Sequence, residues 1–143
     1  MWHTIIIVGN LGRDPEMRFT PNDKAYTRFS VASSRRYTNN EGQSVDETTW
    51  FNITVWGKQA ESSNQYLRKG SRVLVEGRLV PDSGTGSPRI WTRQDGTPGA
   101  SFDVTAQTVR FLTSRAETES GYPSGEYSPE TGKPTSDDEE IPF

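Results

Sequence analysis

The segment TTWFNITVW, residues 48–56, places aromatic rings where they could stack on flat ligands. Alternate side chains of a strand point to opposite faces. One face of this segment would be apolar and belong to a core: Phe51, Ile53 and Val55. The other would combine tryptophans with polar groups: Trp50, Asn52, Thr54 and Trp56. The two rings would lie about 20 Å apart, with room for several stacked bases between them. The alternative is that they pack beneath a loop or at a subunit interface.

Basic side chains recur beside aromatic ones in the rest of the chain. The candidates for a nucleic-acid surface are Tyr37 with Arg35 and Arg36, Lys58 after Trp56, Lys69, Arg72, and Trp91 with Arg89 and Arg93. Rings that stack on bases and cations that meet phosphates are what a single-strand binder needs. Such a face would bind with little sequence preference. Each cation taken alone is also typical of an ordinary solvated surface.

The segment DDEEIPF, residues 137–143, combines negative charge with apolar side chains. Its members are Asp137, Asp138, Glu139, Glu140, Ile141, Pro142 and Phe143. The apolar residues and the terminal carboxylate could enter an apolar pocket with a basic rim, while the acids steer the encounter. The sequence therefore suggests a short ligand for another protein, although a plain solvated tail is the alternative.

The residue types give little support for an enzyme, a cofactor site or a metal site. The chain has no cysteine and a single histidine, His3, and it lacks a phosphate-cradling Gly-Lys-Ser/Thr motif. The acidic run could hold a hard cation weakly, but flexible acidic segments usually stay hydrated. We therefore expect a binding protein that uses no cofactor and no metal, and not an enzyme.

The elements that must position these residues are mostly strands. Short runs of alternating polarity predict strands at residues 4–12, 16–20, 25–37, 48–56, 72–80 and 101–112, with a polar loop at 38–47. On the strand at 72–80, Val73, Val75 and Leu79 would point inward. A helix is expected between residues 58 and 70, with Gly70 as its C′ residue. This pattern favours an all-β fold, a small five-stranded Greek-key barrel of the OB type with one short helix.

Charge and composition divide the chain near residue 112. Residues 1–115 carry 15 basic and 11 acidic side chains, or +4, and residues 116–143 carry 1 and 8, or −7, which together give the net −3. Beyond Leu112 the sequence is rich in Ser, Thr, Gly, Pro and Glu, which cannot bury enough apolar surface to offset its ordering entropy. We expect a folded domain at 1–112, a disordered linker at 113–136 and an acidic tip at 137–143. The apolar run Ile5–Val8 is too short for a membrane span or a signal peptide, which predicts a soluble, intracellular protein.

Several motifs resemble bacterial single-stranded DNA-binding proteins. These are IIIVGNLGRDPEMRFTPN, TTWFNITVWGKQAE, QYLRKGSRVLVEGRL and the terminal DDEEIPF. The resemblance implies an OB-fold protein, usually a homotetramer, that coats single-stranded DNA in replication, recombination and repair. It implies a cytoplasmic, nucleoid-associated location and no membrane. It also implies that the tip docks replication and repair enzymes, and that Tyr37, Trp50, Trp56 and Trp91 stack on bases.

The sequence departs from the family pattern at three places. Tyr37 stands where tryptophan is frequent and Trp56 where phenylalanine is frequent, and both replacements keep a stacking ring. The segment VPDSGTGSP, residues 80–88, resembles an insertion in a loop that helps carry DNA. Two other functions stay open at this point: an adaptor whose tryptophans contact a polypeptide, and an RNA binder.

Overall fold

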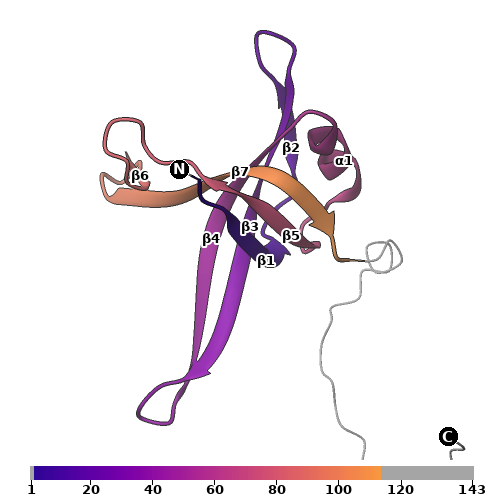
Figure 1. The fold of residues 1–143 in the computed structure, drawn as a ribbon. Coiled ribbons are helices and arrows are strands. Elements are labelled where there is room, and N and C mark those ends of the chain that lie inside the picture. The colour runs from indigo at the N-terminus through magenta and orange to yellow at the C-terminus, as the bar shows by residue number, and fades with distance from the viewer. Residues whose placement is uncertain (1, 114–143) are drawn as a thin grey trace, which may run out of the picture.

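The computed structural model describes residues 2–113, so the predicted tip and nearly all of the predicted linker lie outside it (Figure 1). Seven strands and one helix make up these residues. They are β1 (Ile5–Leu11), β2 (Glu16–Phe19), β3 (Ala25–Thr38), β4 (Ser44–Trp56), α1 (Lys58–Tyr66), β5 (Arg72–Leu79), β6 (Arg89–Thr92) and β7 (Pro98–Phe111).

Five of the strands close into a barrel. β1 pairs with β5, β5 with β7, β7 with β4 and β4 with β3. The ring closes where β3 returns to β1, with Asn10 opposite Ala32 and Leu11 opposite Val31. All of these pairings are antiparallel except that of β4 with β7, which run parallel. A closed five-stranded barrel with one helix between its third and fourth strands is the OB-fold, so the predicted fold class is confirmed.

The interior of the barrel holds the apolar core. Its members are the inward side chains of every barrel strand together with Leu67 after the helix: Ile7, Leu11, Phe29, Val31, Ile53, Val55, Leu67, Val73, Val75 and Val104. The helix α1 is fixed to the barrel by Thr27, whose buried hydroxyl donates a 2.7 Å hydrogen bond to the carbonyl oxygen of Ala60. In the barrel portions of β1, β3, β4 and β5, buried side chains alternate with more exposed ones, as the sequence predicts.

Besides the hairpin of β2 with β3, two arms extend from the barrel in different directions (Figure 1). The longer one joins β3 to β4 through thirteen residue pairs, from Tyr26 opposite Trp56 to Thr38 opposite Ser44. The other is an arm in which β6 pairs with the first residues of β7, with Trp91 opposite Gly99. Both arms carry aromatic residues that the sequence marked as candidates for binding.

The structure corrects four details of the predicted elements. β4 begins at Ser44, inside the predicted loop, because residues 44–47 continue the ladder to β3. The short strand β6 was not predicted. The helix ends earlier than expected, with extended backbone at Leu67, so Gly70 is not its C′ residue and instead takes a positive φ of 87° in the following turn. Leu79 is 37% exposed and not inward; it ends β5, after the shift in register against β7 between Glu76 and Gly77.

Candidate nucleic-acid interface

One exposed face of the sheet gathers three of the four tryptophans. Asn52 of β4 lies opposite Asp103 of β7, and their side chains are hydrogen-bonded, so both point to this side. Alternation along β4 adds Trp50 and Trp56, and the pairing of β6 with β7 adds Trp91. These rings are exposed: Trp50 by 54%, Trp56 by 45% and Trp91 by 44%. We call this surface the tryptophan face.

Two of the rings lie directly on glycines. A Cβ added at Gly12 would come within 2.4 Å of the Trp50 ring, and one added at Gly99 within 2.9 Å of the Trp91 ring. Any side chain at these positions would push the ring away from the backbone. Each tryptophan is thus supported on one side by main chain, and its ring stays about half exposed.

Trp56 has an aromatic neighbour and a nearby cation. Its ring centroid lies 5.1 Å from that of Tyr26, which sits opposite it on β3. The Arg28 guanidinium carbon lies 5.4 Å from the Tyr26 centroid, within the range of a cation–π contact. Arg28 thus lies next to a tilted pair of aromatic rings on the tryptophan face.

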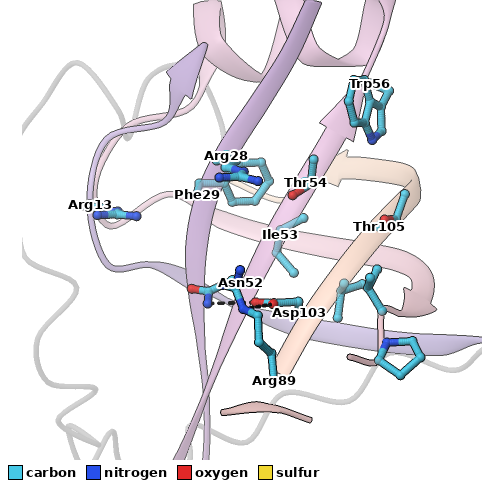
Figure 2. Close-up of a pocket in the computed structure, with 13 residues that line it drawn as sticks. Arg13, Arg28, Phe29, Asn52, Ile53, Thr54, Trp56, Arg89, Asp103 and Thr105 are labelled. Carbon is cyan, nitrogen blue, oxygen red and sulfur yellow. Dashed lines mark hydrogen bonds and ion pairs between the residues drawn. The ribbon is translucent and has the colours of Figure 1, made fainter. Parts of the chain in front are cut away.

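A groove of about 420 Å³ crosses the tryptophan face (Figure 2). Three arginines line it, Arg13 from the loop after β1, Arg28 from β3 and Arg89 from β6. Within residues 2–113, Arg13 and Arg28 have no carboxylate partner. Arg89 does have one, because its Nε lies 3.2 Å from Oδ2 of Asp103. The same carboxylate accepts a 3.0 Å hydrogen bond from Asn52 Nδ2.

The β6–β7 arm positions a second cation beside Trp91. The Arg93 guanidinium carbon lies 5.4 Å from the Trp91 centroid, and its Nη1 donates a 3.0 Å hydrogen bond to the Pro98 carbonyl. Asp95 shapes the turn by accepting hydrogen bonds from the hydroxyl and the backbone N–H of Thr97. These bonds hold the pKa of Asp95 below its ordinary value, so the carboxylate keeps its charge and the turn persists at neutral pH.

The hairpin tip, residues 35–37 and 45–47 of β3 and β4, differs from this face. Arg36 donates hydrogen bonds of 2.6 and 3.0 Å to Asp46, and Arg35 donates one of 2.9 Å to Glu47. The Arg36 contact holds the pKa of Asp46 below its ordinary value, so this pair is intact at neutral pH. Alternation places Tyr37 on the side opposite Trp50, where it contacts Arg35 at 4.8 Å.

The remaining predicted residues lie away from the groove. Lys58 begins α1, Lys69 follows the helix and Arg72 begins β5, and none of the three lines the groove. The structure instead brings in four residues that the sequence did not single out: Arg13, Tyr26, Arg28 and Asp103. Tyr26 and Arg28 lie on β3, the same strand as Tyr37, and only the register of β3 against β4 shows that they share a face with Trp56.

Within the described part of the chain, no helix is long and apolar enough to cross a membrane. The same residues contain no cluster of three or more His, Cys, Asp or Glu side chains placed to hold a metal ion.

A closed barrel with an exposed aromatic and basic face defines the class of OB-fold binding domains. Within that class, the family model described as the single-strand binding protein family matches residues 2–112. The chain therefore belongs to the single-strand binding protein family, which is a family of binding proteins and not of enzymes.

Individual relatives agree with this assignment. The chain is 38% identical over 128 residues to a single-stranded DNA-binding protein of Wolinella succinogenes, covering 90% of this chain and 75% of the relative. It is 40% identical over 119 residues to that of Neisseria meningitidis serogroup A, covering 83% and 64%.

Solved structures agree as well. The small single-stranded DNA-binding protein of Streptomyces coelicolor superposes with a TM-score of 0.62 at 27% identity, covering 76% of this chain and 93% of that one. A deletion mutant of the Thermus aquaticus single-stranded DNA-binding protein superposes with a TM-score of 0.59 at 26% identity, covering 79% and 51%.

Proposed function

We propose that this protein binds single-stranded DNA across the tryptophan face. The observation that carries the proposal is the gathering of three exposed tryptophans with arginines on one side of the barrel. Bases would stack on Trp50, Trp56 and Trp91, and phosphates would meet Arg13, Arg28 and Arg93. Stacking and phosphate contacts are available in every sequence, so the affinity would depend little on sequence.

The proposal is tested by titrating the protein with oligo-dT at several salt concentrations. We expect strong quenching of tryptophan fluorescence and an affinity that falls steeply as salt rises, because phosphate binding releases counterions. Binding that does not respond to salt would favour the rival function, an adaptor that contacts a polypeptide. Tighter binding of oligo-U than of oligo-dT would instead point to RNA.

We further propose that the protein acts in replication, recombination and repair, in the cytoplasm and associated with the nucleoid. Its acidic tip, residues 137–143, would recruit partner enzymes, with Phe143 in an apolar pocket and the acids at a basic rim. Family membership and the residue types of the tip support this proposal. The tip would also compete with DNA for the tryptophan face, since the linker keeps it at a high effective concentration.

Two variants separate the roles of the tip. Deleting residues 137–143 should leave folding unchanged, tighten oligo-dT binding slightly at low salt and abolish partner recruitment. Phe143→Ala keeps all four acids, so competition with DNA should persist while partner pull-down is lost. Partner binding that survives Phe143→Ala would show that charge alone does the docking.

We propose a homotetramer in which residues 2–7 contact another subunit. β1 pairs with β3 only at Asn10 and Leu11, which leaves one edge of its first half without a strand partner among the described residues. Apolar side chains are exposed there, with Trp2 at 75%, Ile6 at 62% and Val8 at 43%. Pairing with a neighbour would cover this edge. A monomer at micromolar concentration in sedimentation would remove the claim and leave DNA binding intact.

A further inference from the structure

One carboxylate, that of Asp103, lines the groove that crosses the tryptophan face. Asp103 is the only acidic residue among the side chains that line the groove, and its side chain is 21% exposed. Asn52 hydrogen-bonds one of its oxygens at 3.0 Å, and Arg89 forms an ion pair with the other at 3.2 Å. Figure 2 shows the three side chains clustered and linked by these contacts, and we call this set the Asp103 row.

A carboxylate at this position cannot serve phosphate binding. It repels a polyanion, and it neutralises Arg89, one of the three arginines of the groove. The groove already has Arg13 and Arg28 to meet phosphates, and neither has a carboxylate partner within the described residues. The Asp103 row is therefore better suited to a neutral group that carries its own hydrogen-bond donor.

The row still has hydrogen-bonding capacity after its internal contacts are counted. Each carboxylate oxygen has a further lone pair, Asn52 has a second amide N–H, and the Arg89 contact uses only Nε. The groups left over include a donor on Asn52, an acceptor on Asp103 and donors on Arg89. Together they complement a ring edge on which a central N–H is flanked by two carbonyl oxygens.

We infer that the Asp103 row reads the edge of a thymine or uracil base, a role that rests on the proposed function. The base N3–H would donate to Asp103, and its two carbonyls would accept from Asn52 and Arg89. Asn52 is two residues from Trp50 on the same face, about 7 Å along the strand, so a base stacked on that ring can turn its edge toward the row. The groove would thus add one base-reading subsite to a surface that otherwise ignores sequence.

N3-methylthymidine provides a direct test, because the added methyl group removes the N3–H donor and leaves the ring free to stack. The affinity of the wild-type protein is measured for oligo-dT and for the same oligonucleotide built from N3-methylthymidine. We expect the methylated oligonucleotide to bind about five- to tenfold more weakly, at the low end of what a hydrogen-bonded base contact contributes. Wild-type protein that binds both alike would overturn the inference and leave the proposed function standing.

Two variants assign the effect to the row. Asp103→Ala should bind both oligonucleotides with equal affinity, because the acceptor is gone. Glu61→Ala removes one negative charge from the exposed side of α1, outside the groove, and should discriminate like the wild type. Equal tightening of both oligonucleotides by Asp103→Ala, with discrimination kept, would overturn the inference, since Asp103 would then act only by charge. The comparison in wild-type protein stands even where a variant fails to fold. Wild-type protein that binds neither oligonucleotide would overturn the proposed function and this inference together.

Discussion

The tryptophan face and the hairpin tip are built from the same residue types and differ in what surrounds them. On the face, Arg28 lies beside the tilted pair of Tyr26 and Trp56 and has no carboxylate partner in the part of the chain described. At the tip, Arg35 and Arg36 each contact an acid on the neighbouring strand. Arginine and aromatic residues close together in sequence therefore do not define a basic surface, because the residue across the ladder decides how much charge is left.

The largest effect is expected on folding stability, from a substitution in the core beneath the tryptophan face. Phe29 is 1% exposed in the core, so Phe29→Ala should lower the free energy of unfolding by about 3–5 kcal/mol. Phe51, which the sequence predicts as a core residue, is only partly buried. Phe51→Ala should therefore lower the free energy of unfolding by less than Phe29→Ala does. Tyr37→Ala at the exposed tip should leave stability almost unchanged. Urea denaturation of the three variants checks this order, and a loss at Tyr37 equal to that at Phe29 would contradict it.

The next largest effect is on DNA binding, and it compares base stacking on the tryptophan face with base stacking at the hairpin tip. Trp50→Ala should weaken oligo-dT binding by about 1–3 kcal/mol, because a free ring on the tryptophan face is lost. Tyr37→Ala should weaken it less, since its ring lies on the opposite side and contacts Arg35. Fluorescence-independent titration, for example by filter binding, measures both. A larger loss of affinity for Tyr37→Ala would mean that the hairpin tip, and not the tryptophan face, carries the main stacking contact.

A smaller effect compares the cations. Arg28→Ala should reduce the slope of log affinity against log salt by about 0.7, the value for one phosphate contact on a single strand. Arg36→Ala should change the slope less, because Asp46 already neutralises that side chain. Affinities over a range of salt concentrations give both slopes. Equal slopes for the two variants would show that the Arg36–Asp46 pair opens when DNA binds.

The smallest effect is expected when Arg36 at the hairpin tip loses its acidic partner. Asp46→Asn removes the partner of Arg36, so oligo-dT binding should tighten slightly, and only at low salt. The pKa of Asp46 is held below its ordinary value, so the pair and its small stabilisation persist at neutral pH and are lost as the pH falls through that lowered pKa. Weaker binding by Asp46→Asn would contradict the view that Asp46 neutralises Arg36 at the hairpin tip.

Alternation and turn residues were enough to predict most of the fold. The exposed and buried sides of β4 follow directly from TTWFNITVW, and the helix occurs where its apolar spacing predicts it. The four-residue strand β6 has no such signal, because it forms only by pairing with β7. The first residues of β4 are mostly polar and were predicted as loop, and they become strand because they pair with the end of β3.

The candidate site could be predicted only where one strand supplies it. Trp50 and Trp56 share a strand, so their common face follows from the spacing alone. Asp103 and Asn52 come together through a parallel pairing of strands that are far apart in the chain, which no local pattern reveals. The ion pairs of Arg35 and Arg36 depend in the same way on the register of β3 against β4.

The parallel pairing of β4 with β7 has a consequence for the order of folding. The β3–β4 hairpin closes across a short turn, whereas the contact of Asn52 with Asp103 joins residues 51 positions apart. Contacts between residues far apart in the sequence require a larger loss of loop-closure entropy, so they are expected to form late. A chain emerging from the ribosome would then hold Trp50 and Trp56 on a hairpin well before it has a groove. The strand that completes the barrel also completes the groove, and full DNA affinity would arise only in molecules that have finished folding.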